Sequence, residues 1–291
     1  MRSPVSTEVS TRAPLSAAPD LPASVDDTPS ALRARTRRGR RRKRLVAVAL
    51  QVAILVAFLV AWEVAVRQGA ISELFVSRPT VVWTSLGTYV TGPDLLLDSW
   101  QTISETMVGF ALGAVGGLVV GLMLGRFELF RWVAGPYLTA LNALPRVALA
   151  PLFILWFGIG MSSKVYLVAS VVFFIVMIAT ESGIRTVDPD LLMMGRAMGT
   201  SEHSIFLKIV LPASVPAVFS GLKLGAVYAL LSAIFGEMLA GQAGWGQKIA
   251  LYSQGFEPGS VFAVLIVVLA FALLLNALMS AGERWFLRWQ R

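Results

Sequence analysis

The sequence predicts an all-α membrane protein with six transmembrane helices, and three observations predict it. Hydrophobic residues make up 56% of the 291 residues and charged residues only 14%, whereas soluble domains carry roughly 25% charged residues. The mean hydropathy is +0.71. The apolar residues also fall in blocks. Residues 45–62 hold no charged side chain, and a run of about that length crosses a ~30 Å hydrocarbon layer as a helix. This composition therefore disfavours an ordinary soluble enzyme.

The composition also excludes several kinds of site. The chain has no cysteine and one histidine, His203, so we expect no disulfide, no thiolate or multi-histidine metal site and no bound cofactor. The net charge is +8. In a soluble protein this charge would suggest nucleic acid as a partner. In a membrane protein it reflects the excess of Lys and Arg in cytoplasmic loops, so no nucleic-acid partner is expected.

Residues 1–44 are predicted to be a disordered, basic, cytoplasmic tail. Residues 3–30 are rich in Ser, Thr, Pro, Ala and Asp and lack a periodic apolar pattern. A run of Arg and Lys then ends at Arg44, directly before the apolar block. Two interpretations are open, a patch for nucleic acid or anionic lipid and a topology signal. The position beside the first span favours the topology signal. A twin-arginine signal peptide fits poorly, because no small-x-small cleavage site follows the long apolar stretch.

The apolar blocks predict spans at 45–66, 106–125, 133–157, 164–180, 216–236 and 261–280. Between the first two spans, an amphipathic surface helix is expected around Thr80–Tyr89. The third span contains Pro136, Pro145 and Pro151, which a membrane helix tolerates when its neighbours bond the freed carbonyl groups. Lys and Arg are more frequent in the segments that share a side with the N-terminus, so both termini, including residues 285–291, are predicted to be cytoplasmic.

Small residues recur at a spacing of four in the second and fifth spans. Such spacing places them on one face of a helix, which lets another backbone approach closely. We favour packing within one subunit over a moving or dimer-forming face. The residues are Gly109, Gly113, Gly117, Gly121 and Gly125 in the second span, and Gly221, Gly225, Ala229 and Ala233 in the fifth.

The segment 183–215, between the fourth and fifth spans, is predicted to hold a short apolar helix. Asp188 is a good N-cap, Pro189 a good first residue, and Gly199 fits the position past the end. About ten residues span ~15 Å, too little to cross a bilayer. A second short helix is expected after Thr200, with Pro212 stopping it. Methionine is favoured on binding surfaces, so the first helix either meets a partner or folds back on its own bundle.

The spacing within this segment resembles the cytoplasmic loop of the permease subunits of bacterial binding-protein-dependent ABC importers. That loop has the form E-A-A-x-x-x-G, nine residues, then I-x-L-P. Gly199, Ile209, Leu211 and Pro212 match it, whereas Met193-Met194-Gly195 stands in place of E-A-A. Asp190 lies one turn earlier and is the candidate substitute for the missing glutamate. The resemblance implies that the segment couples the chain to an ATPase through Asp188, Asp190, Met193, Met194, Gly195, Met198, Gly199, Ile209, Leu211 and Pro212.

The resemblance covers about residues 45–291 and is strongest to the nitrate, sulfonate and taurine branch. It implies a type I ABC importer permease fold, with a first helix and outer segment at 45–98 and a permease domain at 99–284. The stretches that carry it are Leu144-Pro145, Ala150-Pro151-Leu152, Ile154–Gly160, Gly183-Ile184-Arg185, Glu237 with Ala240, Gly244 and Gly246, and Glu283-Arg284.

Membership of this family implies a bacterial plasma-membrane protein without chemistry of its own. The chain has no G-x-x-x-x-G-K-[ST] sequence, so the energy is expected from cytoplasmic ABC ATPase subunits. An extracytoplasmic solute-binding protein would deliver the substrate. A second permease copy would complete the pathway, with lipid around it. The expected cargo is a small anion, either an aliphatic sulfonate, taurine or nitrate.

Polar residues inside apolar spans are costly and mark candidate pathway positions. Asn142 and Arg146 lie in the third span, and Tyr228, Ser232 and Glu237 are expected on one side of the fifth. A guanidinium binds sulfonate or nitrate through paired donors, which makes Arg146 the candidate for an anionic substrate. The alternatives for Arg146 are a water-facing position at a span end and a structural pair with Glu237.

Three other functions remain as alternatives. A proton-coupled secondary transporter would need acidic or histidine relays within the spans. A polytopic membrane enzyme would need clustered histidine or acidic residues at one interface. Few such residues lie inside the predicted spans, which disfavours both functions. The third alternative is an ABC permease for a non-anionic solute, such as a vitamin precursor.

Overall fold

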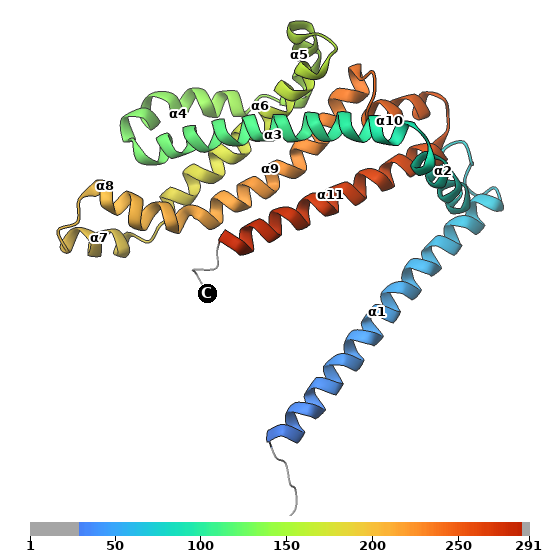
Figure 1. The fold of residues 1–291 in the computed structure, drawn as a ribbon, viewed down its shortest axis with the longest axis horizontal. Helices are drawn as coiled ribbons and strands as arrows, with labels where there is room; N and C mark the ends of the chain where they lie inside the picture. Colours follow the sequence, from blue (N-terminus) through green and yellow to red (C-terminus); the bar gives the residue numbers. More distant parts are fainter. Residues whose placement is uncertain (1–28, 287–291) are drawn as a thin grey trace, which may run out of the picture. The chain divides into compact units, whose positions relative to one another are not determined.

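The computed structural model describes residues 29–286, and every regular element in this range is helical (Figure 1). Residues up to Phe58 form one unit, and the chain from Leu59 onward forms the other. The predictions for residues 1–28 and 287–291 lie outside the described residues. In chain order the elements are α1 (Pro29–Arg67), α2 (Pro79–Thr91), α3 (Asp94–Arg126), α4 (Glu128–Asn142), η1 (Arg146–Leu149), α5 (Ala150–Phe157), α6 (Met161–Arg185), α7 (Pro189–Ala197), α8 (Glu202–Ile205), η2 (Phe206–Val210), α9 (Leu211–Ala240), α10 (Trp245–Gln254) and α11 (Pro258–Phe286).

The first helix begins earlier than the sequence analysis predicts. α1 starts at Pro29, so the structure has a helix over residues 29–44, where the sequence predicts the last part of the tail. Arg, Lys and Ala have high helix propensity, and they extend a helix that the apolar block has already nucleated. Within its own unit, every side chain from Leu45 to Phe58 is exposed, as suits a helix that faces lipid. The stretch Leu45–Arg67 is apolar enough to cross a membrane.

Within residues 29–286, the helices give six candidate spans when one bent pair of helices counts as a single span. The continuous candidates are Leu45–Arg67, Asp94–Arg126, Met161–Arg185, Glu202–Ala240 and Pro258–Phe286. They confirm five of the predicted helices. All five end later than predicted, and all but the first start earlier. The expected amphipathic helix around Thr80–Tyr89 is α2.

The third span is broken rather than straight. Glu128–Asn142 and Arg146–Phe157 meet at a bend of 78°. Pro145 stands at the break and has no N–H to continue the ladder of hydrogen bonds. Pro136 lies inside α4 without ending it, and Pro151 lies in the first turn of α5, where no N–H is needed. Only one of the three prolines therefore marks the break.

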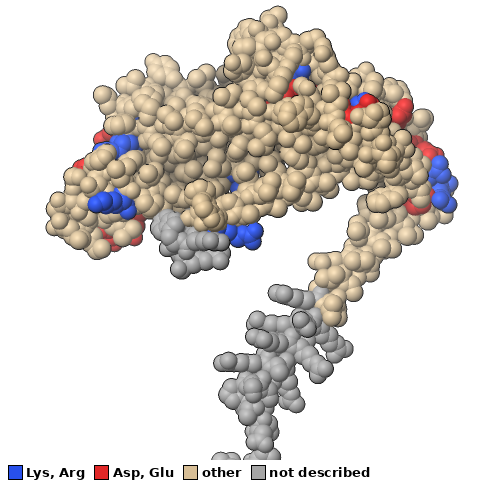
Figure 2. Space-filling model, viewed as in Figure 1, with Lys and Arg blue, Asp and Glu red and all other residues tan. Residues whose placement is uncertain are grey.

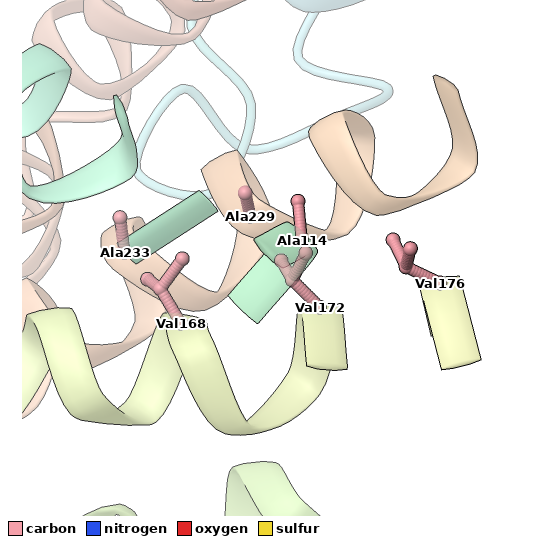
Figure 3. Packing of buried hydrophobic residues seen from close by; sticks show 6 residues of the cluster. All are labelled: Ala114, Val168, Val172, Val176, Ala229 and Ala233. Carbon is pink, nitrogen blue, oxygen red and sulfur yellow. The ribbon is translucent and has the colours of Figure 1, made fainter. Parts of the chain in front are cut away.

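The core of the larger unit is a layer of α3, α6 and α9, in which α6 packs between the other two. Glycines on α3 bring its backbone against α6. A Cβ atom added to Gly113 would lie 2.6 Å from the carbonyl oxygen of Ala169, and one added to Gly121 would lie 2.7 Å from that of Met177. The glycine face is therefore a packing surface within one subunit, as predicted. Figure 3 shows the buried side chains beside it, which are Ala114, Val168, Val172, Val176, Ala229 and Ala233.

The fifth span has no break at Pro212, contrary to expectation. Residues from Glu202 to Ala240 run as one helical stretch of 39 residues. Its segment η2 is a π-helix, in which the Leu211 N–H donates to the carbonyl oxygen of Phe206. Pro212 falls in the first turn of α9. The wide π turn accommodates a residue that cannot donate a hydrogen bond, so the proline does not end the helix.

Charged side chains lie mainly at two ends of the larger unit. In Figure 2, blue and red atoms gather near the end formed by α7 and α8 and near the end formed by α2. Uncharged residues cover most of the visible face between these ends. A hydrocarbon layer excludes charge, so this distribution fits a bundle that crosses a membrane between the two ends.

The glycine contact predicts a position-specific effect of alanine. Gly113→Ala should lower the melting temperature of the detergent-solubilised chain by several degrees, because overpacking against a backbone costs about 1–3 kcal/mol. Gly87→Ala in α2 is the control, because nothing lies within 4 Å of a Cβ atom built there. Alanine is the better helix former, so the control should keep or raise the melting temperature. Equal melting temperatures for Gly113→Ala and the native chain would contradict this packing.

Candidate functional site

The short helix α7 forms as the sequence predicts, because both of its ends are capped. The side chain of Asp188 accepts a hydrogen bond from the Asp190 backbone N–H at 2.9 Å. At the other end Gly199 has φ +73, a conformation that glycine adopts without strain. The N–H groups of Gly199 and Thr200 return to the carbonyl oxygens of Arg196 and Gly195. These caps hold a short helix that has little stability of its own.

One side of α7 packs on its own chain and the other side is open. Gly195 is buried, and a Cβ added there would lie 3.2 Å from side-chain atoms of both Ile205 and Ile209. The exposed fractions of Met193, Met194 and Met198 are 66%, 60% and 78%. The helix therefore rests on α8 and η2 through its small residue and leaves its methionines uncovered. Of the two interpretations left open, folding back on the bundle applies to the Gly195 side only.

An ion pair ties α7 to the helix that follows. The Arg196 Nε donates to a carboxylate oxygen of Glu202 at 2.7 Å. This hydrogen bond raises the pKa of Arg196, which keeps the guanidinium charged. Asp190, the candidate substitute for the missing glutamate, is exposed and forms no ion pair with another described residue. Ile209 is half-buried under α7, whereas Leu211 and Pro212 begin α9.

Arg146 lies at the break in the third span. One of its terminal nitrogens donates to the backbone oxygen of Asn142 at 2.9 Å and to its side-chain oxygen at 2.5 Å. The guanidinium carbon lies 4.0 Å from the ring centroid of Phe174 on α6, a distance typical of a cation–π contact. The buried Nε has no hydrogen-bond partner among the described residues. No described carboxylate pairs with Arg146, so the structural pair with Glu237 is excluded.

A cavity of about 630 Å³ is lined mainly by residues of α4 and α6. Thr139 and Asn142 line it from α4, and Met177 and Glu181 line it from α6. Two arginines also line it, and both are neutralised. Arg131 lies 3.6 Å from Glu128, and Arg185 lies 3.5 Å from Glu181. The lining thus mixes polar groups with apolar side chains such as Leu124, Leu138 and Ile178, and its charged groups are paired.

The three candidate residues of α9 do not share one side of the helix. Tyr228 is 44% exposed, whereas Ser232 and Glu237 are 2% and 1% exposed. Nine residues at about 100° each place Tyr228 and Glu237 on opposite sides. The expectation of a common face is therefore wrong.

Glu237 belongs instead to a buried polar cluster that the sequence analysis missed. The Thr102 hydroxyl donates to one Glu237 oxygen at 2.7 Å, and the Gly246 N–H donates to the other at 2.7 Å. Thr102 also accepts from the Trp245 N–H at 2.9 Å. The carboxyl of Glu237 thus holds the turn before α10 against α3, which is an architectural role.

Asp98 extends this cluster by one turn of α3. Its two oxygens accept from the Gly244 N–H and from the Tyr89 hydroxyl, each at 2.9 Å. Burial and this hydrogen bond raise the pKa of Tyr89, so the phenol keeps its proton. The polar positions Asp98, Thr102 and Glu105 follow the helical spacing i, i+4, i+7. That spacing is the signal that could have placed the start of α3 at Asp94 instead of 106.

Removing the hydroxyl of Thr102 tests this cluster. Thr102→Val keeps the shape of the side chain and leaves the Trp245 N–H and one Glu237 oxygen without a partner, which should cost about 2–3 kcal/mol. The measurement is thermal unfolding in detergent. Ser104→Ala is the control, because the Ser104 hydroxyl bonds only the carbonyl oxygen of Gln101 in its own helix. Equal effects of the two substitutions would contradict a special role for Thr102.

The family model of the binding-protein-dependent transport system inner membrane component matches residues 113–288. The chain belongs to this family. The putative aliphatic sulfonates transport permease protein SsuC of Bacillus subtilis is 30% identical over 229 residues, which cover 79% of this chain and 83% of that protein. The riboflavin transport system permease protein RibX of Chloroflexus aurantiacus is 28% identical over 79% of this chain and 85% of its own length.

The fold of the family is also found among solved structures. A chain of the inward-facing MetNI methionine ABC transporter matches with a TM-score of 0.58 at 20% identity, covering 66% of this chain and 95% of that chain. The protein is therefore a multi-pass inner-membrane permease with the type I ABC importer fold. It is not an enzyme. It works with a separate ATPase, which hydrolyses ATP, and with a solute-binding protein.

Proposed function

We propose that this permease forms the pathway for a small anionic solute of the aliphatic sulfonate class, taurine included, and that α7 docks on the ATPase. The observation that carries the substrate class is the uncompensated charge of Arg146. Similarity to SsuC supports the same class. Similarity to RibX keeps a neutral vitamin-like solute as the second candidate.

Arg146 has the features that a passing anion needs. Its guanidinium is half-buried and has no paired carboxylate among the described residues. Asn142 and the Phe174 ring hold the group in place, and only one of its two terminal nitrogens donates to Asn142. A sulfonate offers three oxygens to such a donor. One cation in a neutral path gives the anion a place to stop without holding it tightly.

The cavity along α4 provides the continuation of this path. Asn142 lines one part of it, and Arg131 and Arg185 line another, each already paired with a glutamate. Paired arginines attract an anion only weakly, which favours release. Tight binding is not needed here, because the solute-binding protein makes the first selection.

The exposed methionines of α7 are the proposed contact with the ATPase. They present an apolar surface of adaptable side chains on a helix that is fixed to α8 and η2. We further propose that α7 and both chain termini lie in the cytoplasm and that two copies of the chain form the permease. Asp190 replaces the family's glutamate as the acidic group beside this contact.

Arg146→Ala should reduce uptake of labelled ethanesulfonate by about tenfold in proteoliposomes that contain the ATPase and the binding protein, because one charge-assisted contact is lost. The affinity of the binding protein for its ligand should stay unchanged. Arg131→Ala is the control and should have a much smaller effect. Normal uptake by Arg146→Ala, or uptake of riboflavin but not of any sulfonate, would overturn the proposed substrate class.

Met194→Asp should prevent the ATPase from co-purifying with the permease, because an unpaired charge in a dry contact costs several kcal/mol. Met194→Leu is the matched control and should retain the ATPase, since it keeps an apolar side chain of similar volume. Membrane insertion should be normal in both variants. Stoichiometric ATPase bound to Met194→Asp would refute docking through α7.

A further inference from the structure

Lys164 is a buried lysine whose three bonds all go to backbone oxygens. It lies in the first turn of α6 and is 3% exposed. Its ammonium donates to the carbonyl oxygens of Ile159 at 2.5 Å, Gly160 at 3.1 Å and Ala240 at 2.9 Å. A cation near a helix N-terminus is disfavoured by the helix dipole. Burying one there is therefore costly, and the three carbonyl bonds offset part of that cost.

A glycine on α9 leaves room for the side chain of Lys164. A Cβ atom added to Gly236 would lie 2.9 Å from the Cγ of Lys164. The stem of the lysine thus crosses α9 at a residue without a side chain and reaches the last residue of the helix. Ala240 is one of the terminal positions whose carbonyl lacks a partner within the helix. Lys164 supplies that partner from a different helix.

The other two bonds fix the link between α5 and α6. Ile159 and Gly160 belong to this link, together with Gly158, which has φ +80. Nothing lies within 4 Å of a Cβ built on Gly158 or Gly160, so packing around these two glycines does not hold the link in place. The Phe157 ring stacks on Tyr166 at 4.3 Å, which joins α5 to α6. The bond to Ala240 then joins the same link to α9.

These contacts connect the two functional ends of the molecule. The helical stretch from Glu202 to Ala240 begins beside α7, to which Arg196 and Glu202 tie it. Its other end is bound through Lys164 to the base of α5. Arg146 lies in η1, which continues directly into α5. A displacement of α7 therefore has a continuous mechanical route to the residue proposed to contact the solute.

We propose that Lys164 is a positioning residue that makes α5 follow the movement of α9. The proposal rests on the proposed function, since it takes α7 as the docking helix. The competing role is charge balance alone, because the carboxyls of Glu105 and Glu237 lie near the ammonium. Neither carboxyl comes within ion-pair distance of Lys164 among the described residues. The carbonyl bonds, not a salt bridge, are its direct contacts.

The double variant K164M/E105Q separates the two roles, because it removes the tether and one nearby acid together. In proteoliposomes with the ATPase and the binding protein, it should assemble and hydrolyse ATP on stimulation by the binding protein. Its uptake should fall by about tenfold, a typical size for coupling between two sites. E105Q alone is the control and should transport. Uptake by the double variant at the rate of E105Q would overturn the proposal.

A thiol reporter on α5 gives a readout that a purely structural role would not change. The native chain has no cysteine, and Trp156 on α5 is 62% exposed. With W156C as the only thiol, the labelling rate should differ between the nucleotide-free and ATP-trapped complexes. In W156C/K164M/E105Q the two rates should be equal. A nucleotide-dependent rate that persists without Lys164 would contradict the tether.

A crosslink tests the same proposal in a chain that keeps Lys164. I159C and A240C place thiols at two residues whose carbonyl oxygens bind one ammonium. If α5 and α9 move together, a short thiol crosslinker applied to the assembled complex should leave uptake within about twofold, well inside typical coupling effects. Loss of uptake on crosslinking would overturn the proposal. Met194→Asp and Arg146→Ala test the proposed function separately, because neither depends on Lys164.

Discussion

The close contact between the backbones of α3 and α6 is the constraint on which the rest of this permease depends. A membrane interior gives little hydrophobic drive for helix association, so close packing has to supply it. Glycine at every fourth position of α3 removes the side chains that would hold α6 away. α6 then presents its valines to the small residues of α9. The bent third span, the turn before α10 and the base of α7 are all attached to these three helices.

Polar groups fix the connecting segments at both ends of the layer of α3, α6 and α9. Thr102, Asp98 and Glu237 fix the turn that leads into α10, and Lys164 fixes the link that leads into α6. At the opposite end, the ion pair of Arg196 and Glu202 fixes α7. Buried polar groups with satisfied hydrogen bonds define one arrangement more sharply than apolar contacts do. The proposed solute path and the proposed ATPase contact therefore rest on a defined framework.

Much of this architecture could be predicted from the sequence, because hydropathy and capping are local properties. The six apolar blocks, the surface helix α2 and the capped helix α7 all follow from residues that act on their own neighbours. The helical start of α3 could not be read from hydropathy, since Asp98 bonds Gly244 and Thr102 bonds Glu237, both more than a hundred positions later. The effect of Pro212 could not be predicted from the sequence either, because it depends on the π turn of η2 that precedes it. The hydrogen bonds of Glu237 to Thr102 and Gly246 could not be predicted either, because a buried acid looks the same in sequence whether it serves transport or architecture.

The π turn at η2 also sets which side of α9 faces the neighbouring helices. A π turn contains one residue more than the α-helical turn it replaces, and one residue corresponds to about 100° of rotation. Everything on α9 beyond Val210 is therefore turned by that amount relative to a regular helix built outward from α8. Without the extra residue, Ala229 and Ala233 would rotate away from Val172, although no residue in the core had changed. The packing of α9 against α3 and α6 thus depends on the number of residues in η2, which lies near α7 at the start of the helix.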